Sequence, residues 1–202
     1  DDKRVHLVRG DREAFGQLAA LSIGRLDAAA RLIIRDRERA RDVVQETLVR
    51  AWRSLPSLRD PERFDGWVRQ LLVRAGLIPA VAGGVLPGSG GWRRVLMRPG
   101  EAPLDELRRV LVSGAKDPLA EALDALPVGG RLLLAVDQLE ELFTVCRSDT
   151  ERAAFVDALA RAAADPHGRA VVVAALRADF YGRFAAFPEL AACMEMARRV
   201  GG

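Results

Sequence analysis

The chain has 202 residues, 50% of them hydrophobic and 29% charged, which is enough apolar material for one or two ordinary domains. None of its apolar stretches reaches the roughly 20 residues that a membrane helix needs, so no membrane span is expected. Two cysteines without ligand spacing argue against a zinc site or a disulfide framework. Since no secretory signal opens the chain, we expect a cytoplasmic protein.

The net charge of +3 is unevenly distributed. Residues 1–75 contain 16 Lys or Arg against 12 Asp or Glu, whereas residues 76–202 contain 15 against 16. A nucleic-acid-binding surface is therefore expected in the first part, although an Arg-rich solvated helical surface explains so small an excess equally well. The sequence patterns also change near residue 75, and we predict two domains, 1–75 and 76–202.

Helices are expected throughout residues 1–75. The first follows Asp11, a possible N-cap, and its apolar residues recur at spacings of three to five. The second follows Asp36, with apolar residues at i, i+4, i+7 and i+11. The third is predicted to start at Asp60-Pro61-Glu62, which combines a capping side chain, an early proline and an early acid.

The third helix is expected to be long. No breaker interrupts its apolar spacing before Gly76 and Pro79. We therefore predict one helix from about Asp60 to Ile78 or beyond, joining the two domains.

Polar residues off the apolar stripe of the second helix form a candidate binding face. They are Asp42, Gln45, Glu46, Arg50 and Arg53. Asp42 and Glu46 stand four residues apart, so their carboxylates share one helix face and could bind a basic partner. An ordinary solvated face, with Glu46 paired to Arg50, explains the same spacing and is favoured if spacing is the only criterion.

Three segments of this part, Gly10–Phe15, Asp42–Arg53 and Phe64–Val68, occur in a recognisable order and spacing. Together, about residues 5–75 resemble region two of the extracytoplasmic-function sigma factors of bacterial RNA polymerase. In that family the second helix binds the coiled coil of the polymerase β′ subunit, and the following loop meets the melted −10 promoter element. The helix-turn-helix domain that reads the −35 element does not occur in residues 76–202.

The resemblance implies roles for individual residues of this chain. It places polymerase binding on Asp42, Gln45, Glu46 and Arg50. It places contacts with −10 promoter DNA on Arg53, Leu58, Arg59, Arg63, Trp67 and Arg69, the arginines following the phosphate backbone by charge.

Residues 76–202 show a different pattern, in which short apolar runs alternate with helical stretches. Strands are expected at Arg94–Met97, Arg131–Val136 and Ala170–Leu176, with helices at about Pro103–Val112, from Asp117-Pro118 to Leu126, and at Glu151–Ala164. This order predicts an α/β domain with a parallel sheet, whose ligands bind at the carboxyl ends of the strands.

Charged residues follow two of the expected strands. Asp137 stands where P-loop NTPases hold Mg²⁺, and Glu140 or Glu141 could orient an attacking water. Arg177, after the last strand, could sense a γ-phosphate. Acids that merely begin a helix, and an ion pair between Arg177 and Asp179, are the simpler explanations.

Segments Leu72–Ala80, Leu133–Thr144 and Leu176–Gly182 resemble the novel STAND group of P-loop NTPases, over about residues 71–198. In that family a Walker A loop, G-x-x-x-x-G-K-[ST], precedes the segment similar to Leu72–Leu77. This sequence has lysine only at Lys3 and Lys116, and the motif is absent from it. Residues 83–89 have the glycine spacing, but serine occupies the lysine position and no strand leads in, so we interpret them as a decoy.

These observations lead to one combined expectation. We expect an α then α/β chain in which a sigma-factor-like transcription initiation module, binding RNA polymerase core and promoter DNA, is fused to a remnant of a nucleotide-binding domain. Asp137, Glu140 and Glu141 would then be vestigial, and Mg-ATP would bind only if a phosphate loop came from elsewhere. The alternatives are a STAND-type ATPase signalling switch and a non-catalytic protein-interaction module.

Overall fold

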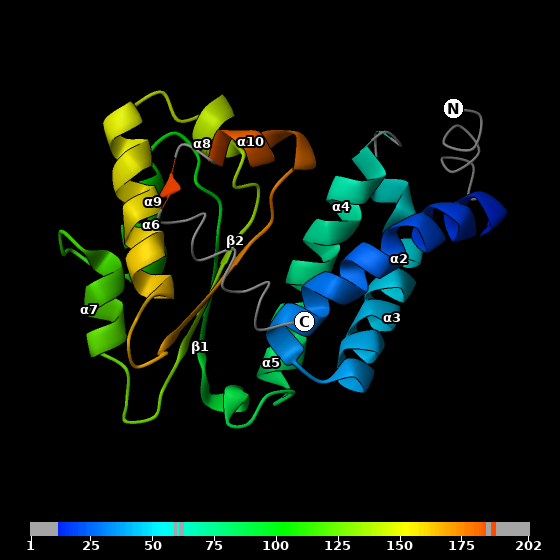
Figure 1. Cartoon of the computed structure of the whole chain (residues 1–202), viewed down its shortest axis with the longest axis horizontal. Helices are drawn as coiled ribbons and strands as arrows, with labels where there is room; N and C mark the ends of the chain where they lie inside the picture. The colour runs from blue at the N-terminus through cyan, green and yellow to red at the C-terminus, as the bar shows by residue number, and fades with distance from the viewer. Residues whose placement is uncertain (1–11, 59, 61–62, 185–186, 189–202) are drawn as a thin grey trace. The chain divides into compact units, whose positions relative to one another are not determined.

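The computed structural model describes residues 12–58, 60, 63–184 and 187–188, and it confirms the predicted class, helical and then α/β (Figure 1). The described residues form two compact units, one up to Leu86 and one from Pro87 onward. The division falls later in the chain than residue 75, where the sequence patterns change. None of the described helices is long and apolar enough to cross a membrane.

The first unit is built from helices joined by short turns. Its elements are α2 (Arg12–Ile34), α3 (Arg37–Ser54), the 3-10 turn η1 (Leu55–Ser57), α4 (Phe64–Leu71), the π-helical segment η3 (Leu72–Leu77) and α5 (Ile78–Ala82). Asp36 caps α3 as predicted, because its Oδ1 accepts hydrogen bonds from the N–H groups of Glu38 (3.0 Å) and Arg39 (3.1 Å). The proposed cap Asp11, together with Pro61 and Glu62, lies outside the described residues.

The third predicted helix is long, as expected. From Phe64, α4, η3 and α5 follow one another without a break to Ala82. The helical path passes Pro79, which has no N–H to donate, and it widens into a π-helical segment just before that residue. This long helix belongs to the first unit, where η3 packs against α2 and α3.

The second unit contains a three-stranded parallel sheet in the order β1-β2-β3. Its elements are the 3-10 turn η4 (Ser89–Gly91), β1 (Arg93–Met97), α6 (Pro103–Leu111), α7 (Pro118–Asp124), β2 (Leu132–Val136), α8 (Glu141–Thr144), α9 (Asp149–Ala163), β3 (Ala170–Ala174), the 3-10 turn η5 (Ala178–Phe180) and α10 (Tyr181–Phe184). All three predicted strands are therefore confirmed, and Met97, Val136 and Ala174 lie in register at their carboxyl ends.

One hydrophobic core holds this unit together. Leu132, Leu134 and Val136 alternate along β2 into a cluster with buried residues of β1, α6, α7 and α9. Figure 1 shows α6, α7 and α9 together on one side of the sheet. Every residue of β2 is buried, whereas β3 is only partly buried because it forms an edge of the described sheet.

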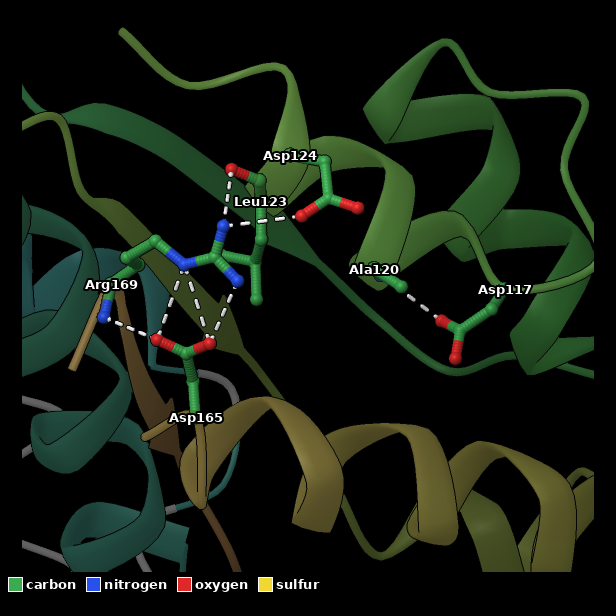
Figure 2. Close-up of polar contacts among 6 residues, drawn as sticks. All are labelled: Asp117, Ala120, Leu123, Asp124, Asp165 and Arg169. Atoms are coloured by element: carbon green, nitrogen blue, oxygen red, sulfur yellow. Dashed lines mark hydrogen bonds and ion pairs between the residues drawn. The ribbon is translucent and has the colours of Figure 1, made fainter. Parts of the chain in front are cut away.

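Arg169, directly before β3, connects the turn at Asp165 with the last residues of α7 (Figure 2). Arg169 Nη2 donates to Asp165 Oδ1 at 2.9 Å, and its backbone N–H donates to Asp165 Oδ2 at 2.8 Å. Its Nη1 donates to Asp124 Oδ1 at 3.1 Å and to the carbonyl oxygen of Leu123 at 3.3 Å. The side-chain and backbone hydrogen bonds from Arg169 lower the pKa of Asp165 to about 2.

This lowered pKa predicts a loss of stability at low pH. The pKa of Asp165 is lower in the folded chain than in the unfolded chain, so its ionised carboxylate stabilises the fold. This contribution to the free energy of unfolding is fully present above the ordinary aspartate pKa of about 3.9 and is lost as the pH falls through about 2. The difference in urea midpoint between wild type and Asp165→Asn is therefore expected to be constant above about pH 4 and to shrink towards pH 2. Asp157→Asn, which changes a half-exposed carboxylate, is the control. A difference that stays the same from pH 4 to pH 2 would contradict the assignment.

Candidate functional site

The acidic face predicted on the second helix is open to solvent. Asp42, Gln45 and Glu46 are all exposed on α3. The opposite face of the helix is buried in the first unit and consists of Ala40, Val43, Val44, Thr47 and Ala51. The helix is therefore fixed by its apolar side and presents the two carboxylates and the amide outwards.

Arg50, the fourth residue of the predicted face, holds α3 to the long helix. Its Nε donates to Glu46 Oε1 at 2.9 Å, which confirms the pairing expected from the i+4 spacing, and its Nη1 donates to the carbonyl oxygen of Ala75 at 2.7 Å. Ala75 lies in the π-helical segment η3, a few residues before Pro79. Arg50 thus gives a backbone carbonyl of this segment a side-chain donor from α3.

An aromatic cluster joins the three long helical segments of the first unit. Phe15 of α2 lies edge-on to Trp52 of α3, with ring centroids 5.2 Å apart, and to Phe64 of α4 at 5.8 Å. Trp67 continues the cluster at 5.9 Å from Phe64 and is half-buried. Trp67, which the sequence assigned to DNA binding, therefore packs against Phe64 and is partly open to solvent.

A polar contact, not predicted from the sequence, also joins α2 to the first turn of α4. Asp65 accepts hydrogen bonds from Ser22 Oγ at 2.5 Å and from Arg25 Nη2 at 3.2 Å. Ser22 is almost fully buried, so its hydroxyl needs such a partner. The only sequence signal was a serine on the otherwise apolar stripe of the first helix.

The other residues expected to contact DNA have different surroundings. Arg53 is exposed, Arg63 is exposed and pairs with Asp60 at 3.2 Å, and Arg69 donates to the carbonyl oxygen of Asp65 at 3.0 Å. Leu58 is only 8% exposed, so its side chain belongs to the core of the unit in this conformation. Arg59 lies outside the described residues.

In the second unit, Asp137 lies directly after β2 and is fully buried. Its Oδ2 accepts a hydrogen bond from Arg98 Nε at 3.3 Å, and Arg98 follows β1. The Arg98 side chain is 45% exposed, so this ion pair spans from the interior to solvent. The structure thus places an arginine against the carboxylate that the sequence assigned to Mg²⁺.

Glu140, Glu141 and Arg177 also lie at the carboxyl ends of the strands, as predicted. Glu141 Oε2 accepts from the backbone N–H of Gly100 at 3.0 Å, and Glu140 Oε2 accepts from the backbone N–H of Arg177 at 3.4 Å. The Arg177 guanidinium pairs with Asp179 at 2.8 Å, the simpler of the two predicted roles. Each of these side chains therefore contacts a neighbouring loop or side chain of the same unit.

The surroundings of these residues differ from those of a Mg-ATP site of the P-loop kind, in which a phosphate loop with a lysine lies beside the strand-end aspartate. Residues 83–88 form turns and bends, and the short turn η4 then leads into β1. A phosphate loop instead follows a strand and opens an α-helix, so its amides and lysine can surround the phosphates.

A small parallel sheet with acids at its carboxyl ends is the plan of nucleotide-binding α/β proteins. Residues 71–200 match the family model described as Novel STAND NTPase 1. Because this match spans more than half of the sequence, the chain belongs to that family. Residues 23–77 match the model of Sigma-70 region 2, so this part is similar to that domain. No curated protein and no solved structure matches the chain.

The two family matches overlap in residues 71–77, the last residue of α4 and the whole of η3. Leu72, Val73 and Leu77 of this overlap are buried, and η3 packs against α2 and α3. A segment that the NTPase family model includes thus contributes to the core of the sigma-like unit.

Proposed function

We propose that the first unit binds the core of bacterial RNA polymerase and −10 promoter DNA, as region two of a sigma factor does, and that the second unit is a scaffold that does not bind ATP. The observation that carries the proposal is the acidic face of α3, formed by Asp42, Gln45 and Glu46. These side chains are exposed together on a helix whose other face is buried.

Charge complementarity supports the polymerase contact. Two carboxylates on one face suit a basic helical partner such as the β′ coiled coil, and complementary charges raise the association rate as well as specificity. Arg50 lies at the end of this face, and its bonds to Glu46 and Ala75 hold the Glu46 carboxylate in place. In this proposal Arg50 both lies beside the binding face and keeps the Glu46 carboxylate in position.

The DNA contact is supported by the side chains around the turn between α3 and α4. Arg53 and Arg63 are exposed and can approach phosphates, while the partly exposed Trp67 can stack on an unpaired base. The Arg69 side chain donates to the carbonyl oxygen of Asp65, which holds it close to the first turn of α4. The buried side chain of Leu58 is not part of this proposed surface.

Reversal of charge on α3 tests the polymerase contact. The double variant Asp42→Arg/Glu46→Arg is expected to bind purified core polymerase at least about tenfold more weakly than the wild-type chain, because like charges then face a basic coiled coil. Affinity is measured by biolayer interferometry with immobilised core enzyme.

The matched control reverses two exposed acids that are not part of α3, Glu13→Arg and Glu101→Arg, and so changes the net charge by the same amount. It is expected to retain wild-type affinity. Equal affinities for the two double variants, or no binding by the wild-type chain, would remove the polymerase assignment.

A further inference from the structure

Two of the strand-end acids hold one short loop. Arg98 Nε donates to Asp137 Oδ2 at 3.3 Å, and Gly100 N–H donates to Glu141 Oε2 at 3.0 Å. The backbone N–H of Asp137 also donates to the carbonyl oxygen of Met97 at 2.9 Å. We propose that Arg98 is the resident counter-charge of Asp137, and that residues 98–100 occupy, from within the chain, the place where a P-loop NTPase binds Mg²⁺.

Burial makes a counter-charge at Asp137 necessary. Asp137 has no exposed surface, and Val136, Leu139 and Leu142 around it in sequence are also buried. An ionised carboxylate in such surroundings is stable only when a positive group and hydrogen bonds compensate for its lost hydration. The Arg98 guanidinium reaches Asp137 while almost half of its side chain stays in water, so it supplies charge without itself being fully buried.

The backbone of the loop is shaped for this contact. Gly100 has a φ of 63°, a conformation that residues with a side chain rarely adopt, and Pro99 between the two anchor points is buried. The loop is therefore attached at both ends, through the Arg98 side chain and through the Gly100 N–H. One attachment is made to Asp137, directly after β2, and the other to Glu141, the first residue of α8; β1 and β2 are neighbours in the sheet.

The proposal concerns the second unit alone and is independent of the polymerase contact. If it is correct, the stability of the second unit depends on Arg98 and not on a bound divalent cation. Removal of Arg98 takes a positive group away from a fully buried carboxylate, and neutralising that carboxylate should relieve the effect.

Thermal unfolding of the full chain tests this dependence. Arg98→Met is expected to lower the Tm by about 10 °C, and the double variant Arg98→Met/Asp137→Asn to recover at least about half of that loss. The wild-type Tm should differ by less than about 1 °C between EDTA and about 10 mM MgCl₂. Arg177→Met is the matched control, because its ion pair with Asp179 is exposed on both sides, and its Tm should fall by less than about 2 °C.

The proposal is overturned if Arg98→Met is no more destabilising than Arg177→Met. It is also overturned if Asp137→Asn does not relieve the Arg98→Met defect, or if Mg²⁺ raises the wild-type Tm by several degrees in a manner that Asp137→Asn abolishes. Should Arg98→Met fail to fold, recovery of a folded double variant supports the proposal, and failure of both variants contradicts it.

Discussion

Replacing Gly76 by leucine is expected to destabilise the first unit by more than about 3 kcal/mol. A Cβ at this position would lie 2.4 Å from Thr47 Oγ1 and 3.2 Å from Val43 Cγ1. Thr47 cannot move away freely, because its side chain is fully buried and its Oγ1 donates to the carbonyl oxygen of Val43 at 2.7 Å. A leucine therefore forces η3 and α3 apart, and the packing of both helices is lost.

The loss is measured as the free energy of unfolding in urea, followed by far-ultraviolet circular dichroism. The matched control is Gly24→Leu, since Gly24 is also helical and exposed, and a Cβ there meets no atom within 4 Å. This control is expected to be stabilised by up to about 1 kcal/mol, because leucine has the higher helix propensity. Equal unfolding free energies for the two variants would show that η3 does not pack on α3 as described.

This contact bears on the proposed function because it holds α3, the helix that presents the acidic face. Gly76 lies in the stretch that both family models match, and it contacts α3 on the side opposite to Asp42 and Glu46. The part of the chain where the two families overlap therefore stabilises the proposed polymerase-binding surface.

Local signals in the sequence predicted most of the fold correctly. The capping role of Asp36, the apolar stripe of α3 and the continuous apolar run of β2 all depend on neighbouring residues, and all three are confirmed. The helix predicted to reach Ile78 or beyond continues past Pro79 to Ala82. The hydrogen bond from Arg50 to Ala75 could not be predicted, because the two residues are 25 apart in the sequence. Periodicity cannot indicate such distant partners.

The candidate site in the second unit illustrates the same limit. Rules for parallel sheets placed Asp137, Glu140, Glu141 and Arg177 at the strand ends correctly. Their actual partners could not be predicted, because Arg98 is 39 residues from Asp137 and Gly100 is 41 residues from Glu141. The sequence left two explanations for these acids, a vestigial nucleotide site and the start of a helix, and the structure shows Asp137 in contact with Arg98 and Glu141 in contact with Gly100.

No saturable binding of Mg-ATP is expected at nucleotide concentrations up to about 1 mM, which corresponds to a binding free energy weaker than about −4 kcal/mol. In P-loop proteins, backbone amides and a lysine of the loop hold the β- and γ-phosphates, and the strand-end aspartate acts through Mg²⁺. This sequence contains no G-x-x-x-x-G-K-[ST] motif. Asp137 contacts Arg98, and Glu141 contacts Gly100, so a nucleotide would have to displace contacts within the protein as well.

Isothermal titration of the full chain with Mg-ATP tests most directly whether the second unit is a scaffold. We predict only heats of dilution, the same for the wild-type chain and for Asp137→Asn. A micromolar dissociation constant for the wild-type chain that is lost in Asp137→Asn would contradict this prediction and favour a STAND-type ATPase switch.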